Sequence, residues 1–556
     1  MENTSEKYLS HLNNCIPKRA NNYMLSTYSI ILEAWRRGLE VTIRIVLEKS
    51  GNIEPYYSIT DGKKTHNFSA TRGDLVSKEA KILTKNKQSA KEYLIKNNVP
   101  TPIGKEFNET ISNSKIIEYA KELDYPIVVK PLQGTGGTGV IGNIQNEEEL
   151  IEALDYVRRD LKLPHILLEK YHEGLDYRIY VVNGEVIGAL KRIRSHITGD
   201  GKNTIKDLIN QKNKIRRKLP SLSNRPIKID AETKNLLKRK NYDLNTVIPE
   251  GEVFYLKSKN NISAGGDSVD VTDLVSKNIK KIAVEATKSF PSLPHCGLDM
   301  IVDEASDTGV VIELNSRAHI TQHLFPMEGH ARDIPTSIID YYFPNTKNQN
   351  REEVSKLYID YDFIYNSCLS RTAQEIKLPK ITESPIILKR YLLSNCQFTE
   401  QFANRIRRTA FNHKVNGYIK PLDNGNIVIV TGATKQKAEQ FEKLLKNIAH
   451  KFFNNVQIVE KSRVTPIKHG FHIEADMQTI NKADADMSEL PLQKYSKLKE
   501  DYQKITRKLA EYEQKESIME LTKKQNKQLK KQLLKIENST SWKITKPVRA
   551  IAKFKK

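Results

Sequence analysis

The segment YPIVVKPLQGTGGTGVIGNI constrains the fold of this chain more than any other feature. PIVVK has the pattern of a buried strand, a glycine-rich loop follows, and VIGNI has the pattern of a second strand. Gly134, Gly136 and Gly139 fit G-x-G-x-x-G, but a dinucleotide site needs that loop to open directly into a helix, and here the helix starts only at Asn146. The segment therefore predicts a hairpin lid whose backbone N–H groups can cover phosphates, with an ordinary glycine-rich turn as the alternative.

Polar residues on other expected strands point to the same chemistry. Lys130 ends the strand before the loop, where an ammonium group could reach phosphate oxygens. Farther along, CGLDMIV and VVIELNSRA indicate two apolar strands that carry Asp299, Glu313 and Asn315. Because Glu313 and Asn315 are two residues apart, they face the same side of their strand, and three oxygen ligands could converge on Mg²⁺. Solvated acidic side chains are the alternative interpretation.

The composition indicates a soluble protein of the cytoplasm. Only 38% of the 556 residues are hydrophobic, and no run of 18 apolar residues suggests a membrane-spanning helix. The first residues, MENTSEKYLSHLNN, lack the apolar core of a secretory signal. The four cysteines are widely scattered and form neither a C-x-x-C pair nor a credible disulfide framework, which suits a reducing compartment.

Changes of pattern along the chain predict several domains of the α/β and α+β classes. STYSIILEAWRRGLEV has helical periodicity and VTIRIVLE follows as a strand, while every motif above lies in the next 270 or so residues. The predicted regions, in chain order, are an N-terminal α/β region (1–79), the catalytic domain (80–345), a linker region (346–385), a second compact domain (386–475), a linker (476–492), a coiled coil (493–537) and a basic amphipathic tail (538–556).

The C-terminal part differs in character from the rest. From Tyr495 to Tyr512, apolar residues recur at alternating steps of three and four, which predicts a coiled coil that pairs with itself, a solvated single helix being the alternative. The formal charge is +23, and residues 519–556 hold twelve Lys and Arg against two Glu. This basic tail suggests docking at an anionic membrane surface, with a solvated tail as the alternative. Nucleic acid is not expected as a partner.

Taken in order, the motifs from Ser77 to Pro344 resemble those of the ATP-grasp superfamily, above all the ATP-grasp domains of cyanophycin synthetase and then of bifunctional glutathione synthetases. The resemblance rests on NKQSAKEYLIKNNVPTP, VVKPLQGTGGTGV, LLEKYHEGLDYRIYVVNG, HITGDGKNTIKDLI, GEVFYLKSKNNISAGGDSVDVTDLV and CGLDMIV followed by IELNSR. It implies the ATP-grasp fold, with ATP and Mg²⁺ as cofactors and Mn²⁺ as a possible substitute for the metal.

The same resemblance implies a role for individual positions. These are phosphate contacts for Lys87 and Lys130; a lid formed by Gly134, Gly136, Gly137 and Gly139; an adenine edge lined by Glu169, Lys170 and Tyr171; a ribose contact for Glu173; a structural or phosphate-side contact for Arg178; basic positions near the transferred phosphoryl group for Arg192 and His196; and magnesium ligation by Asp299, Glu313 and Asn315. Two departures lie toward the acceptor side and leave the substrates open. The family's N-x-x-P-G becomes NSRAH after the metal Asn, and Gly297 stands where D-alanine–D-alanine ligases carry Arg.

The implied activity is a ligase that activates a carboxylate as an acyl phosphate and couples it to an amine, with amino-acid or peptide-like substrates. A non-catalytic ATP-binding scaffold of a cell-envelope assembly is one alternative. Residues 386–475 follow β-α-β-β-α-β order and resemble the ferredoxin-like fold of acylphosphatase, so acylphosphatase activity is another. By that alignment Pro421 replaces the family's catalytic Asn and Ala403 its phosphate-binding Arg, which predicts that this domain has lost hydrolysis.

Overall fold

The structure is a computed structural model that describes residues 7–48, 51, 53–132, 139–347, 355–381, 385–463 and 465–474. The chain divides into two compact units, residues 1–474 and 475–556, and the second lies outside the described residues. The predicted linker at 476–492, coiled coil and basic tail therefore remain predictions. Within the described part of the chain, no helix combines the length and the apolar character needed to cross a membrane.

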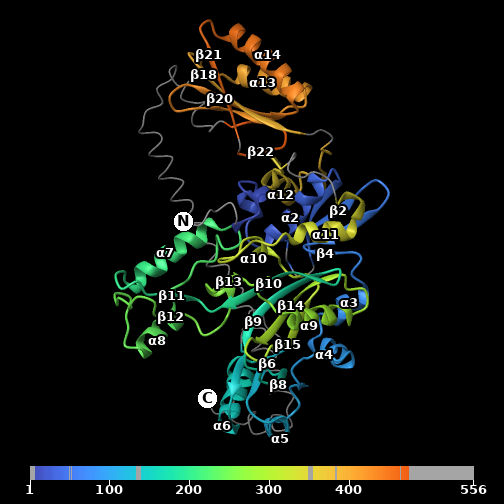
Figure 1. Cartoon of the computed structure of the whole chain (residues 1–556), viewed down its shortest axis with the longest axis vertical. Coiled ribbons are helices and arrows are strands. Elements are labelled where there is room, and N and C mark those ends of the chain that lie inside the picture. Colours follow the sequence, from blue (N-terminus) through green and yellow to red (C-terminus); the bar gives the residue numbers. More distant parts are fainter. Residues whose placement is uncertain are drawn as a thin grey trace, which may run out of the picture. The chain divides into compact units, whose positions relative to one another are not determined.

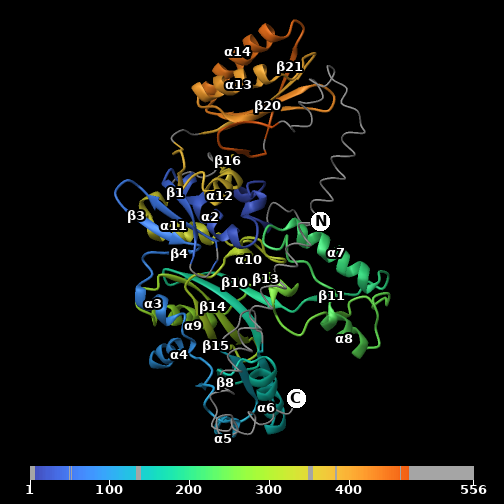
Figure 2. The ribbon, with the colours of Figure 1, turned by 180° about the vertical axis from the view of Figure 1, so that it is seen from behind.

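The N-terminal region forms a five-stranded sheet in the order β17-β1-β2-β3-β4, with helices α2, α11 and α12 around it (Figures 1 and 2). The predicted helix and strand are confirmed as α2 and β1, and α2 is buried over nearly its whole length. The bounds are α2 Tyr23–Arg36, β1 Glu40–Leu47, β2 Ile53–Thr60, β3 Thr65–Ser69, β4 Arg72–Gly73, α11 Ile334–Tyr342, α12 Tyr361–Leu369 and β17 Glu375–Lys377, with short helices η1 Ser10–Leu12, η2 Lys18–Ala20 and η5 Pro344–Thr346. The stretch 346–385, expected as a linker, thus contributes α12 and β17, because β17 pairs with β1 at this sheet's edge.

A four-stranded sheet of order β5-β8-β6-β7 carries the glycine-rich segment. β6 and β7 pair antiparallel, Ile127 opposite Ile144, which confirms the predicted hairpin. Asn146 caps the next helix by accepting the N–H of Glu149 at 2.9 Å, as its sequence position predicts. The bounds are β5 Gly104–Phe107, α5 Asn113–Leu123, β6 Ile127–Pro131, β7 Ile141–Ile144, α6 Glu147–Leu154, the π-helical turn η3 Asp155–Asp160 and β8 Ile166–Lys170.

A second sheet, of order β13-β10-β9-β14-β15, holds the acidic and basic residues of the predicted site, with α9 packed on it. The β9–β10 hairpin turns at Asn183 and Gly184, both with positive φ, as the sequence predicts. The bounds are α3 Lys78–Leu83, α4 Lys87–Lys96, β9 Leu175–Val182, β10 Glu185–Ile193, β13 Asp267–Asp270, α9 Lys277–Lys288, β14 His295–Asp303, β15 Thr308–Asn315 and α10 Thr321–Leu324.

The chain between β10 and β13 forms an insertion with its own small core, which includes Ile197, Ile209 and Phe254. Its elements are β11 His196–Thr198, α7 Ile205–Lys218, α8 Ala231–Arg239, β12 Val253–Tyr255 and η4 Ile262–Ala264, and β11 pairs with β12. This insertion brings His196 and a buried ionic cluster close to the end of β10.

The last described region runs β-α-β-β-α-β from β18 to β21 and then adds the short strands β22 and β23; its sheet has the order β21-β18-β20-β19-β23. Ala403 is buried in the first turn of its helix α13, and Pro421 ends β19. The bounds are β18 Ile387–Ser394, α13 Glu400–Asn412, β19 Asn416–Pro421, β20 Ile427–Ala433, α14 Lys435–Phe452, β21 Gln457–Ser462, β22 Ile467–Lys468 and β23 Phe471–Ile473; β22 also pairs with β16 Leu357–Tyr358.

Candidate functional site

A buried lysine and a half-buried lysine share one carboxylate at the end of the small sheet. One carboxylate oxygen of Glu169, on β8, forms an ion pair with Nζ of Lys130 from β6. The other forms an ion pair with Nζ of Lys91 from α4. The side chains of Lys91 and Glu169 are 5% and 3% exposed. Burial raises the pKa of Glu169, but the two ammonium groups outweigh it and hold the pKa below its usual value. The site therefore carries an ionised carboxylate and a net positive charge, which suits the binding of phosphate.

Lys91 is a residue of this site that the sequence analysis does not identify. Lys87, the predicted phosphate contact, begins α4 one turn earlier and has no ion pair among the described residues. Both lysines stand in the motif NKQSAKEYL, and a spacing of four places them on neighbouring turns of one helix face. The buried face of α4, with Ala90 and Leu94, could have identified Lys91 as the inward-pointing lysine.

The predicted lid and adenine edge are described in part. Gly134, Gly136 and Gly137 lie outside the described residues. Gly139 has φ +72°, and a Cβ there would meet Pro131 Cγ at 2.7 Å, so only glycine fits this point. Lys170 donates to the backbone oxygens of Asp124 and Tyr125 at 3.1 Å. The ring of Tyr171 lies against Gly142 of β7, and Glu173 is exposed.

An ionic network crosses three strands of the large sheet. Arg178 of β9 stands opposite Asp299 of β14, and its Nε lies 2.5 Å from Asp299 Oδ1. Arg192 of β10 lies 3.1 Å from the same oxygen and binds Asp176 of β9 at 2.6 Å. Sequence reasoning missed Asp176, although its spacing of two from Arg178 puts both on one face of β9.

Burial and pairing set the charges of this network. Burial would raise the pKa of Asp299, but Arg178 and Arg192 hold it below its usual value. Burial, together with the nearby charge of Asp299, raises the pKa of Asp176 despite its bond to Arg192. For Arg192, burial disfavours the charge, while Asp299 and Asp176 more than compensate and raise its pKa. Two guanidinium groups and two carboxylates thus balance one another next to the predicted metal ligands.

The predicted metal ligands lie on adjacent strands in register. Asp299 stands opposite Glu313, and Gly297 stands opposite Asn315, since the ladder skips Ile312 as a bulge. Glu313 and Asn315 are exposed, and Asn315 Oδ1 accepts the N–H of Arg317 at 2.9 Å. Among the described residues no three His, Cys, Asp or Glu side chains are grouped to hold a metal. Two carboxylates and an amide are nevertheless hard oxygen donors that fit Mg²⁺, which takes its other contacts from phosphates and water.

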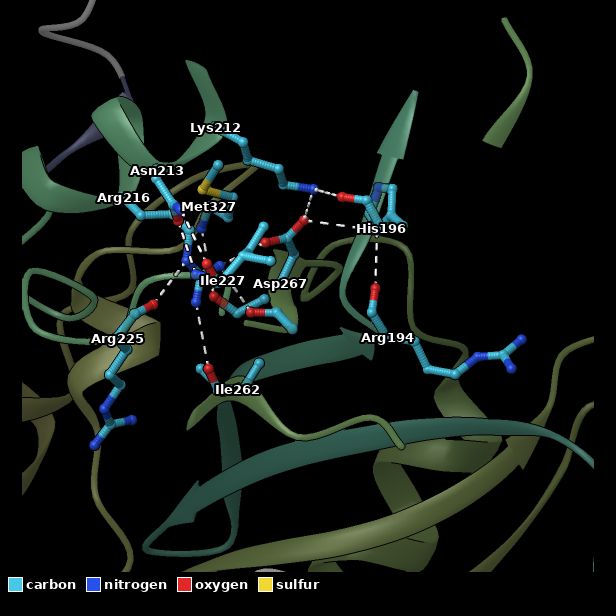
Figure 3. Close-up of polar contacts among 12 residues, drawn as sticks. Arg194, His196, Lys212, Asn213, Arg216, Arg225, Ile227, Ile262, Asp267 and Met327 are labelled. Carbon is cyan, nitrogen blue, oxygen red and sulfur yellow. Dashed lines mark hydrogen bonds and ion pairs between the residues drawn. The ribbon is translucent and has the colours of Figure 1, made fainter. Parts of the chain in front are cut away.

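His196 lies in the insertion, where it contacts Arg194, Lys212 and Asp267 (Figure 3). Its Nδ1 is 2.9 Å from the backbone oxygen of Arg194, to which it donates, and 3.7 Å from Asp267 Oδ2. Lys212 Nζ binds the backbone oxygen of His196 at 2.8 Å and Asp267 Oδ2 at 2.5 Å. Arg216, fully buried, binds the other oxygen of Asp267 at 2.8 Å. The imidazole is therefore held in one orientation, and a direct role in phosphoryl transfer remains a prediction.

Comparison with known proteins gives one family and several relatives. Residues 84–218 match the RimK-like ATP-grasp domain. The bifunctional glutathione biosynthesis protein of Clostridium perfringens is 31% identical over 329 residues, which cover 57% of this chain and 41% of that protein. The cyanophycin synthetase of Synechocystis is 33% identical over 229 residues, which cover 40% of this chain and 26% of that protein. The chain thus spans less than half the length of these curated relatives.

The solved structures that align with this chain have lower sequence identity to it. A bifunctional glutathione synthetase from Pasteurella multocida aligns with a TM-score of 0.46 and 22% identity, over 58% of this chain and 43% of that one. A D-alanine–D-alanine ligase from Bacillus anthracis aligns with a TM-score of 0.29 and 16% identity, over 48% of this chain and 70% of that one.

Proposed function

We propose that the protein is an ATP- and Mg²⁺-dependent ligase that joins a carboxylate to an amine, on the premise that residues 84–218 match the RimK-like ATP-grasp domain. The observation that carries this proposal is the ionic network on β9, β10 and β14, with Asp299 in register with Glu313 on β15. This network lies in the same compact unit as the ion pairs that Lys91 and Lys130 form with Glu169.

Each group has a definite task in such a reaction. Lys91 and Lys130 bind phosphate oxygens as point charges, and Glu169 fixes both ammonium groups in place. Asp299, Glu313 and Asn315 would hold the magnesium, which neutralises charge on the phosphates. Arg178 and Arg192 orient the Asp299 carboxylate between them.

The reaction has two steps in this proposal. A substrate carboxylate takes the γ-phosphoryl group of ATP, which leaves ADP and an acyl phosphate, and the amine then displaces phosphate from the acyl carbon. The glycine-rich segment between β6 and β7, the predicted lid, would exclude water, which would otherwise hydrolyse the acyl phosphate. Amino-acid or peptide-like molecules are the proposed substrates, since the relatives named above are synthetases of glutathione and cyanophycin.

The test is ATP-dependent phosphate release, screened with amino acids and short peptides in the presence of Mg²⁺. Once a substrate pair is found, Glu313→Gln should lower the rate by roughly a thousandfold, because the metal charge acts on the transferred phosphoryl group. Glu185→Gln, an exposed carboxylate at the far end of β10, is the matched control and should keep the rate. ADP formation by Glu313→Gln at the unaltered rate would refute the metal assignment.

A second candidate function is a non-catalytic ATP-binding scaffold, which the predicted coiled coil and basic tail favour. It predicts ATP binding with Mg²⁺ but no ADP formation with any amino acid or peptide. We further propose that residues 386–475 form a ferredoxin-like, acylphosphatase-like domain without hydrolytic activity, supported by the strand order β21-β18-β20-β19 and by alanine and proline at positions 403 and 421.

A further inference from the structure

A cavity of about 410 Å³ lies at the end of β9 that is remote from Asp176 and Arg178. Its wall combines the loop before α3, the β9–β10 turn, the end of α9 with the loop that leads to β14, and helix α11. The turn residue Asn183 follows Arg178 by five positions, which is roughly 16 Å along an extended strand. None of the site residues predicted from the sequence lines this cavity. It is therefore separate from the proposed ligase site.

The floor of the cavity is apolar. Phe290 and Leu293, in the segment between α9 and β14, line it and are only 3% and 5% exposed. Thr287 lines it too, but its hydroxyl already donates to the backbone oxygen of Ala283 at 3.0 Å. A ligand that covers this floor gains by excluding water from apolar surface, so the floor selects a ligand with an apolar body.

The rim of the cavity is polar. The side chains of Asn183, Lys288 and Ser292 line it and are exposed. Among the residues that the structure describes, none offers these three side chains a hydrogen bond or an ion pair. Their donors are therefore available to a ligand that enters from solvent. An apolar floor below a few polar groups is the usual arrangement of a small-molecule site.

Lys288 gives the rim its charge. Lys288 is the last residue of α9, where the helix end carries a partial negative charge of about one half, so the ammonium group outweighs it. A Cβ at Gly184 would meet Lys288 Cε at 3.4 Å, so the lysine stem lies along the β9–β10 turn. On the same helix Lys281 pairs with Glu285 at 3.8 Å, whereas the described chain gives Lys288 no carboxylate. The excess positive charge favours an anionic group on the ligand.

Hydrogen bonds between separate segments hold the wall in place. The N–H of Asn183 donates to the backbone oxygen of Pro294 at 2.7 Å, and the N–H of Ser77 donates to that of Ser292 at 3.0 Å. Ser77 Oγ also donates to the backbone oxygen of Pro291 at 2.6 Å. These bonds tie the loop before β14 to the β9–β10 turn and to the start of α3, which lies beside α9 in both views (Figures 1 and 2). A wall that is already formed lowers the entropic cost of binding.

We propose that this cavity is a second ligand site, which binds a small aromatic acid with its ring on Phe290 and Leu293 and its carboxylate beside Lys288. The volume of about 410 Å³ is within the range of roughly 300–1,000 Å³ that such ligands occupy. Phe290 offers the ring an aromatic partner, and the ammonium group offers the carboxylate a point charge. The site does not depend on the proposed ligase function, because no group assigned to that function contributes to it.

The test uses the full-length protein with Mg²⁺ and a non-hydrolysable ATP analogue, which fills the nucleotide site. Isothermal titration calorimetry compares indole-3-acetate with indole-3-acetamide, which has the same shape without the charge. We expect the acetate to bind at least fivefold more tightly, and Lys288→Met to reduce this preference to less than twofold. Lys277→Met, an exposed lysine at the first position of α9, is the matched control and should keep the full preference.

A second variant tests the apolar floor. Phe290→Leu keeps an apolar side chain but removes the ring, so it should weaken both probes at least threefold and leave the preference for the acetate intact. No binding of either probe, equal affinity for the two, a preference that survives Lys288→Met, or unchanged affinity in Phe290→Leu would overturn the site. The analogue is titrated separately, and its failure to bind would count against the ligase function alone. Circular dichroism confirms that each variant is folded.

Discussion

Substituting Lys91 by methionine tests the assignment of the phosphate site most directly. The change removes one of the two ammonium groups on Glu169 while a side chain of similar length fills the space. Lys91 is 4% exposed, so its charge is held almost entirely by Glu169. Burial raises the pKa of Glu169 and the lysines lower it, so the carboxylate left with Lys130 alone is less well compensated.

The expected size follows from burial. Breaking a buried ion pair costs about 3–5 kcal/mol, and since Lys130 remains, the lower limit of about 3 kcal/mol applies here. That corresponds to a fall in Tm of roughly 6 °C or more. Loss of one charged contact to phosphate should weaken binding of an ATP analogue by roughly tenfold to a hundredfold.

Thermal unfolding and calorimetric titration of the analogue with Mg²⁺ measure the two effects separately. Lys96→Met, an exposed lysine at the other end of α4, is the matched control and should change neither value appreciably. Adding Glu169→Gln to Lys91→Met should restore much of the Tm, because the undercompensated charge is gone, but not the nucleotide affinity. If Lys91→Met behaves like the unaltered protein, or if Lys96→Met shows the same losses, the reasoning fails.

Three further predictions concern pH and the C-terminal half. Burial lowers the pKa of His295 to about 4 and of His323 to about 3, so both rings stay neutral in the folded state but take up protons on unfolding below pH 6.5. The free energy of unfolding in urea should therefore fall between pH 7 and pH 5 by about 2 kcal/mol for each ring, and a value independent of pH would contradict this. The fragment 386–475 should fold without hydrolysing benzoyl phosphate; efficient turnover would disprove the alignment at Ala403. Deleting residues 538–556 should abolish salt-sensitive binding to anionic vesicles, as measured by co-sedimentation, whereas equal binding of both forms would exclude a docking tail.

Local patterns in the sequence are sufficient to predict much of the fold. Strand–loop–strand order around the glycine segment predicts the β6–β7 hairpin, because alternation and turn residues act over a few positions. Asn146 and the Asn183-Gly184 turn are local signals of the same kind. A spacing of two likewise places Glu313 and Asn315 on one face of β15.

The partners of the site residues could not be predicted in this way. Arg178 meets Asp299 across 121 positions of sequence, through the register of β9 with β14. Nothing local distinguishes Lys91 from Lys87 except the apolar face of α4. The polar stretch after Pro344 resembles a linker, yet β17 pairs with β1 because the N-terminal sheet leaves that edge open to it. Register, helix orientation and edge pairing are all decided by packing between distant segments.

The same packing explains how the site accommodates glycine at position 297. In the resemblance to D-alanine–D-alanine ligases, an arginine stands at this position, on the strand of the metal Asp. Here the missing side chain leaves room on β14, and Arg178 comes from β9 so close that a Cβ at Gly297 would lie 3.4 Å from its Nη1. A guanidinium group is thereby supplied beside Asp299 from the neighbouring strand.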